Sequence, residues 1–214
     1  MENSTSKLPE TFTIIGMDPP AGKNCGWAVV RFKDNKPHLI RKFTQVLDKA
    51  CGDTGLEDIY QQLDRMINEE GVTVLCMERQ MGGGLQFTRA KLNEFVGVTK
   101  LCCHRHGIKV VEVSPNHLKL VFAGHGSAPK QKIMSNVVKT FGLASPGPEH
   151  ECDAVALAVS YLIDNGWQGY TIQDPYTDEE KEADKLAKIE RKQKKAARAA
   201  KKEAEKKASK KAKG

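Results

Sequence analysis

Two acidic residues, Asp18 and Glu78, each follow an apolar run that is typical of a buried strand, TFTIIGMD in one case and VTVLCME in the other. In an open α/β sheet, ligands bind at the carboxyl ends of neighbouring strands. Carboxylates that converge at such an edge can hold divalent ions, and these ions support phosphodiester hydrolysis. Taken singly, either acid could be an ordinary turn or cap residue, so the pair matters only if the two strands are neighbours.

A third acidic element is the segment PEHECDAVALAVSYL, residues 148–162, whose apolar spacing predicts a helix. His150 and Asp153 lie in its first turn, three residues apart, so their side chains share one face. Glu149 shares that side, whereas Glu151 points away. Acidic residues in a first turn are also favoured by the helix dipole, so simple N-terminal capping is the alternative interpretation.

The elements that must position these residues follow a recognisable order. Three strand-like segments joined by short loops predict an antiparallel meander, and alternating strands and helices follow. We expect an α/β fold with a mixed five-stranded sheet, three antiparallel strands and then two parallel ones, with helices on both faces. The predicted strands are 11–18, 26–32, 37–45, 72–79 and 108–113, and the predicted helices are 55–71, 85–106 and three that begin near Ser114, Lys130 and Glu149.

The charge of the chain is concentrated at one end. The net charge is +7, and residues 175–214 carry 15 of the 34 Lys and Arg and 8 of the 27 Asp and Glu, so the rest of the chain is neutral. Apolar residues other than Ala nearly vanish after Pro175, so no second core can form there. We expect a flexible segment 1–10, a nuclease-like domain 11–170, and a Lys/Ala-rich tail 171–214 that is mostly disordered or partly helical.

The six cysteines include no CxxC pair, so reduced and mostly buried thiols are expected. The run CCHRH, residues 102–106, has metal-ligand residue types, but five adjacent residues on a helix point in different directions. We interpret it as a helix end with two packed thiols. No apolar stretch approaches the roughly 20 residues that span a bilayer, and no secretory signal pattern is present. The expectation is a soluble, intracellular protein of the cytoplasm or nucleoid that does not act at a membrane.

Four segments resemble, in family order, the motifs of the RuvC family of Holliday-junction resolvases, which have an RNase H-like fold. GMDPPAGKNCGWAVV resembles the first catalytic motif, and VLCMER resembles the second. HLKLVFAGHGSAPK resembles the family's signature of two lysines around a GxGxA segment, and HECDAVALA resembles the last motif. The resemblance extends from about Thr13 to Leu162. The basic tail lies outside it.

The resemblance implies that Asp18, Glu78, His150 and Asp153 form the catalytic and metal-binding set. Two Mg²⁺ ions per active site would be the cofactor, with Mn²⁺ as a possible substitute, and Asp18 would bridge both ions. Two roles stay open for His150, which could ligate a metal as a neutral imidazole or orient the attacking water.

The resemblance also implies DNA contacts. Lys119 and Lys130 match the family's two functional lysines and would neutralise the scissile phosphate. The loop after the second motif, MGGG, replaces the aromatic residue that the family often inserts into the junction, and Met81 is the apolar candidate for that role. The tail is either a nonspecific phosphate-binding arm or a solubilising or targeting extension. The predicted DNA-binding residues are Arg79, Met81, Gly82, Lys119, Lys130 and Lys132.

By resemblance, the predicted function is a homodimeric, metal-dependent, structure-selective endonuclease. It would resolve four-way and related branched DNA junctions by paired symmetric nicks that leave 5′-phosphate and 3′-hydroxyl ends. Helix 85–106 is the candidate dimer seam. A noncatalytic branched-DNA-binding protein is one alternative. An actin-like ATPase or sugar kinase is another, although such enzymes need about twice this length and a second phosphate loop. The sequence identifies no branch-migration or replication partner.

Overall fold

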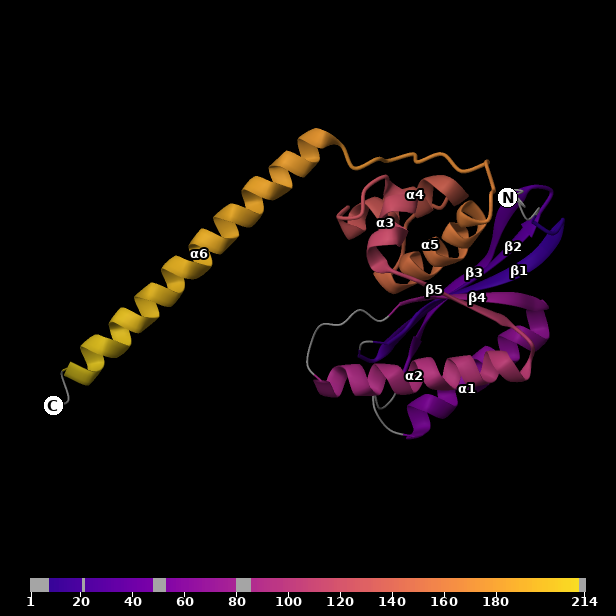
Figure 1. Ribbon diagram of the computed structural model, residues 1–214, viewed down its shortest axis with the longest axis horizontal. Helices are drawn as coiled ribbons and strands as arrows, with labels where there is room; N and C mark the ends of the chain where they lie inside the picture. The colour runs from indigo at the N-terminus through magenta and orange to yellow at the C-terminus, as the bar shows by residue number, and fades with distance from the viewer. Residues whose placement is uncertain (1–7, 21, 48–52, 80–85, 212–214) are drawn as a thin grey trace, which may run out of the picture. The chain divides into compact units, whose positions relative to one another are not determined.

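The computed structural model describes residues 8–20, 22–47, 53–79 and 86–211 (Figure 1). The chain divides into two compact units, residues 1–175 and residues 176–214. Each unit is considered by itself. The predicted boundaries near residues 10 and 170 stay predictions.

Five strands form one sheet in the order β3-β2-β1-β4-β5. The first three strands are antiparallel neighbours, whereas β1 pairs with β4 and β4 pairs with β5 in parallel. The predicted fold class is therefore confirmed, including the change from antiparallel to parallel pairing at β1. The strands are β1 (Thr11–Asp18), β2 (Asn24–Lys33), β3 (Lys36–Val46), β4 (Val72–Glu78) and β5 (Lys109–Val113).

Helices cover both faces of the sheet (Figure 1). On one face, α1 (Asp53–Glu70) and α2 (Gln86–Arg105) pack over a core that includes Ile15, Met17 and Trp27 of the strands. On the other face lie α3 (Pro115–Ala123), α4 (Lys130–Phe141) and α5 (Glu149–Asp164). Because side chains alternate along a strand, the even-numbered residues of β1 face α5.

Helix α5 is the central element of the first unit, and every residue from Cys152 to Leu162 is buried. It can lie this close to the sheet because glycine occupies the contact positions on β1 and β2. A Cβ added at Gly16 would overlap the carbonyl oxygen of Ala154, and one added at Gly26 would overlap the carbonyl oxygen of His150. The missing side chains therefore set the distance between the helix and the strands.

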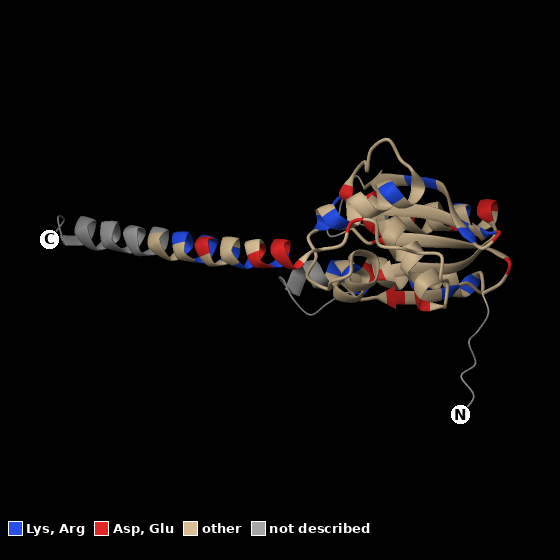
Figure 2. Cartoon of the chain, turned by 90° about the horizontal axis from the view of Figure 1, so that it is seen from above, with Lys and Arg blue, Asp and Glu red and all other residues tan. Residues whose placement is uncertain are grey.

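The second unit consists mainly of α6 (Asp178–Lys211), a single helix. It begins with a reciprocal capping box, in which the Glu180 amide donates to the Thr177 hydroxyl (3.3 Å) and the Thr177 amide donates to the Glu180 carboxylate (3.0 Å). Acidic residues fill its first turn, and Lys and Arg follow (Figure 2). That order complements the helix dipole, and Ala, Lys and Glu have high helix propensity. Local interactions therefore favour a helix that has no apolar face to pack.

Five cysteines in the described part of the chain (25, 76, 102, 103 and 152) are free and buried, as expected from the sequence. Cys51 lies outside the described residues. Among the described residues, no helix has the length and apolar character needed to cross a membrane.

The contact between Gly16 and α5 predicts a large effect of one added methyl group. Gly16→Ala should lower the free energy of unfolding by about 3 kcal/mol or more, because the backbone of α5 has to move away from β1. Urea unfolding at equilibrium measures the change. Gly22→Ala is the matched control, since Gly22 is exposed in the loop between β1 and β2 and the added methyl group meets nothing within 4 Å. There alanine should be neutral or stabilise the protein by up to about 1 kcal/mol. Equal stabilities for the two variants would contradict the conclusion that the absence of a side chain at Gly16 allows α5 to pack closely on β1.

Candidate active site

Two neighbouring parallel strands bring Asp18 and Glu78 to the same edge of the sheet. Met17 is paired with Met77 in the parallel register, and the two acids are the next residues of their strands. Met17 and Met77 both belong to the core beneath α1 and α2. Because side chains alternate, Asp18 and Glu78 point to the opposite face, where α5 lies.

The first turn of α5 completes the cluster. The Nδ1 atom of His150 lies 2.6 Å from Oδ2 of Asp18. Gly26 is the cross-strand partner of Asp18, and the backbone of His150 rests on it. The absence of a side chain at Gly26 thus allows the histidine to reach the aspartate. Asp153, one turn further along the helix, is buried.

Two lysines from the neighbouring helices flank the acids. Lys130, at the start of α4, forms an ion pair with Glu149, and its Nζ lies 3.5 Å from Oδ2 of Asp153. Lys119 lies on α3, and its positive charge offsets a small part of the rise in the pKa of Glu78 that burial causes. Helix α3 is fixed at its start by Ser114, whose hydroxyl accepts from the amide of His117 (3.2 Å). The structure thus groups both lysines with the predicted acids.

The acids of this cluster resist ionisation. Burial, and then the negative charges of Asp18 and Asp153, raise the pKa of Glu78 to about 7. Burial and the charge of Asp18 raise the pKa of Asp153 to about 6. Burial also raises the pKa of Asp18, although its hydrogen bond with His150 acts in the opposite direction. Three carboxyl groups therefore share one region with too little positive charge to balance them.

Such a donor set suits hard divalent cations, which prefer carboxylate oxygen ligands and supply the missing positive charge. The three carboxyl groups do not form a compact trio of donor atoms. Within the described residues, one trio of possible ligands has its donor atoms all within 4.8 Å of one another, and it is Asp64, Cys102 and His106 rather than this cluster. Like charges repel, so a bound cation would be expected to bring the acids closer together.

Comparison with known proteins identifies the family. Residues 14–161 match the family model described as crossover junction endodeoxyribonuclease RuvC. The chain belongs to the RuvC family. The match contains all four motifs, from the strand before Asp18 to the helix that carries Asp153.

Individual RuvC proteins resemble the chain over most of their length. The crossover junction endodeoxyribonuclease RuvC of Gloeobacter violaceus is 29% identical over 161 residues, which cover 72% of this chain and 87% of that protein. The structure of Thermus thermophilus RuvC superposes with a TM-score of 0.64 at 21% identity and covers 73% of this chain and 98% of that one. T. thermophilus RuvC in complex with Holliday junction substrate gives the same TM-score at 22% identity, over 70% and 92% of the two chains. The fold is thus that of RuvC.

The remaining DNA-binding residues predicted from the RuvC resemblance have mixed positions. Arg79 is exposed just after β4, and its guanidinium donates to the carbonyl oxygen of Glu112 (3.4 Å). Lys132 is mostly buried and forms an ion pair with Asp174 (2.8 Å), which ties α4 to the segment after α5. Met81 and Gly82 lie outside the described residues.

A buried anchor that the sequence did not reveal holds the start of α5. Lys42 of β3 donates to Oε2 of Glu151 (2.6 Å) and to the carbonyl oxygen of Pro146 (2.8 Å), and Thr44 donates to the other oxygen of Glu151 (3.1 Å). Glu151 does point away from the cluster, as its helical position predicts. Its partners lie more than 100 residues away in the sequence, so no local pattern identifies them.

The raised carboxyl pKa values predict that the site destabilises the metal-free protein. Between pH 4 and 7 the folded state keeps protons that the unfolded chain releases, so stability falls as the pH rises through this range. In a chelator, Glu78→Gln should unfold at higher urea concentration than the parent at pH 8 and at nearly the same concentration at pH 4. The exposed Glu57→Gln is the control and should show no such pH-dependent gain. If the effect of Glu78→Gln on stability did not vary with pH, the raised pKa of Glu78 in the folded protein would be disproved.

Proposed function

We propose that this RuvC-family protein cuts four-way DNA junctions at the cluster of Asp18, Glu78 and Asp153. The observation that carries the proposal is the convergence of three ionisation-resistant carboxyl groups from β1, β4 and α5 at one edge of the sheet. T. thermophilus RuvC, which has the same fold, has a known structure in complex with Holliday junction substrate. The family's name describes the same reaction, an endonucleolytic cut at a crossover junction.

The three carboxylates would hold the divalent ions, and the number and kind that we propose is two Mg²⁺ per site. All three side chains offer only oxygen donors, and the pKa values of Glu78 and Asp153 are raised first by burial and then by the negative charges of neighbouring carboxylates. Both properties fit Mg²⁺, with Mn²⁺ as a possible substitute. When bound, such ions polarise the phosphate and lower the pKa of a coordinated water.

His150 is proposed to act on the attacking water rather than as a metal ligand. A carboxylate can only accept, so the short contact with Asp18 assigns the imidazole proton to Nδ1. In the neutral ring, Nε2 then accepts a hydrogen bond, and the side chain is 35% exposed. Asp18 thus fixes the ring orientation and leaves one nitrogen able to orient water or to take up its proton.

The two lysines are proposed to receive the scissile phosphate. Lys130 is half exposed and already contacts Glu149 and Asp153, so its ammonium group lies at the border between the acids and solvent. A DNA phosphate that enters the site would exchange one carboxylate partner of Lys130 for a phosphate oxygen. Lys119 approaches the same region from α3, and both cations would stabilise charge that develops on the phosphate.

The central test is Asp18→Asn, which keeps the shape of the side chain but removes its charge. We expect the cleavage rate of a synthetic four-way junction in Mg²⁺ to fall about 1,000-fold or more, while the Kd for the same junction changes little. Asp34→Asn, in the turn between β2 and β3, is the matched control and should cleave normally. Normal cleavage by Asp18→Asn would refute the assignment of the site, and junction binding without cleavage by the parent protein would favour the noncatalytic alternative.

Paired symmetric nicks need two active sites, so we propose that the protein acts as a homodimer with α2 at the seam. Leu101, on α2, is 52% exposed and offers an apolar contact for a partner helix. A dimer of this kind relates the two sites by one two-fold axis, which matches the symmetry of a four-way junction. The products would carry 5′-phosphate and 3′-hydroxyl ends.

Light scattering tests the seam. The parent protein should have the mass of a dimer, and Leu101→Lys should shift it toward the monomer and replace paired nicks with uncoordinated single nicks. Ile40→Lys, at an exposed apolar position on β3, should leave the dimer intact. A parent protein that stays monomeric at the concentration where it cleaves would contradict the paired mechanism.

A further inference from the structure

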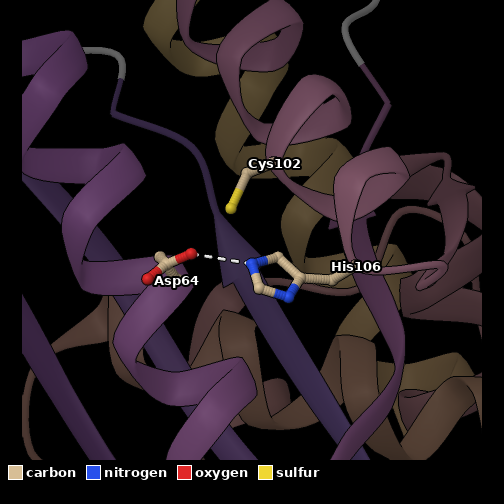
Figure 3. A group of neighbouring side chains, drawn as sticks. All are labelled: Asp64, Cys102 and His106. Atoms are coloured by element: carbon tan, nitrogen blue, oxygen red, sulfur yellow. Dashed lines mark hydrogen bonds and ion pairs between the residues drawn. The ribbon is translucent and has the colours of Figure 1, made fainter.

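A second set of metal-ligand residue types lies where α1 meets α2. Its members are Asp64 of α1, Cys102 of α2 and His106 just after α2 (Figure 3). Nothing in the proposed cleavage reaction uses them. They combine oxygen, sulfur and nitrogen donors, unlike the all-carboxylate cluster at the ends of β1 and β4.

The three side chains converge on one point. Their donor atoms all lie within 4.8 Å of one another, and Nε2 of His106 is 2.7 Å from Oδ1 of Asp64. Cys102 and His106 are four residues apart, which is one helical turn, so both face α1. Five adjacent residues such as CCHRH do point in different directions, but these two share a direction and the third donor comes from another helix.

Neighbouring contacts hold the donors in place. Asn68, one turn beyond Asp64 on α1, donates to Oδ2 of Asp64 (3.2 Å), so that Oδ1 is the oxygen directed at His106. The amide of His106 donates to the carbonyl oxygens of Cys102 (3.3 Å) and Cys103 (3.2 Å), which fixes the last turn of α2. Hydrogen bonds of this kind orient ligands in protein metal sites.

We propose that Asp64, Cys102 and His106 bind a divalent transition-metal ion of the zinc class. Tetrahedral zinc takes nitrogen and oxygen ligands at about 2.0 Å and sulfur at about 2.3 Å, which separates the ligand atoms by roughly 3.3–3.8 Å. The donor atoms lie within 4.8 Å of one another, so they would have to move only slightly closer to coordinate the ion. Nε2 of His106 and Oδ1 of Asp64 would move apart from their hydrogen-bond distance to admit it. Asp64 and His106 are partly exposed, so water can fill the fourth position.

The sulfur donor determines which ion fits. Thiolate and imidazole select zinc-like ions over Mg²⁺, which takes oxygen ligands and would stay at the acidic cluster. Burial, followed by the negative charge of Asp64, raises the pKa of the Cys102 thiol to about 11. The incoming ion therefore displaces one proton from sulfur, which is released to solvent. The bound ion would clamp α1 to α2.

Cobalt(II) is the probe that separates this site from the carboxylates, because a cobalt–thiolate bond gives an ultraviolet charge-transfer band and a carboxylate does not. The reduced full-length protein, freed of metal and titrated with Co²⁺ alone, should develop this band, and the intensity of the band should saturate, because Co²⁺ bound by carboxylates adds nothing to it. Added Zn²⁺ should displace the cobalt and abolish the band. Cys103→Ser is the matched control, since Cys103 is the adjacent buried thiol of α2 and no member of the trio, and it should behave like the parent.

Two variants make the result decisive. Cys102→Ser should lose the band completely, and Asp64→Asn, a substitution at a partly exposed position, should weaken cobalt binding at least tenfold while junction cleavage in Mg²⁺ is unchanged. A parent protein without the band, or a band that survives in Cys102→Ser, would overturn the proposal. The cleavage assay with Asp18→Asn is independent of this measurement, so failure of either assignment can be recognised separately.

Discussion

The geometry of the candidate active site depends on the close contact between the backbone of α5 and the sheet at Gly16 and Gly26. A side chain at either position would overlap the helix and push it outward. His150 occupies the first turn of that helix and Asp153 lies one turn further along, so the same contact sets the position of both residues relative to the strands. The packing of α5 against the sheet therefore also positions the side chains of the cluster. The burial of α5 along most of its length reflects this close packing.

The same packing creates an electrostatic cost. The fold buries three carboxyl groups in one region. Burial raises the pKa of each group and so opposes its ionisation. Lys130, Lys119 and His150 offset part of the charge at the edge of the cluster. Burial of apolar surface by α5 has to outweigh the rest in the metal-free protein. A cation that bound the acids would offset this cost of ionisation. The same buried negative charge therefore destabilises the metal-free protein and favours metal binding.

Sequence patterns predicted the sheet and the position of its acids because both are local properties. Apolar runs identified β1 and β4, and the last residue of each run necessarily lies at a strand end. The anchor formed by Lys42 and Glu151 could not be predicted, since its partners are brought together only by tertiary packing. Lys132 is a predicted DNA-binding residue, and its ion pair with Asp174 (2.8 Å) is likewise a tertiary contact that no local sequence pattern identifies.

The trio between α1 and α2 shows how reasoning from neighbouring residues alone can miss a group of possible metal ligands. Five consecutive helical residues cannot all face one point, but residues one turn apart can, and a neighbouring helix can complete the set. Asp64 of α1 completes the group of possible ligands that Cys102 and His106 begin. No sequence pattern near residue 64 indicates that it lies beside them. Donor chemistry then separates the two clusters. Oxygen ligands alone suit Mg²⁺, whereas a set with sulfur and nitrogen suits zinc-like ions.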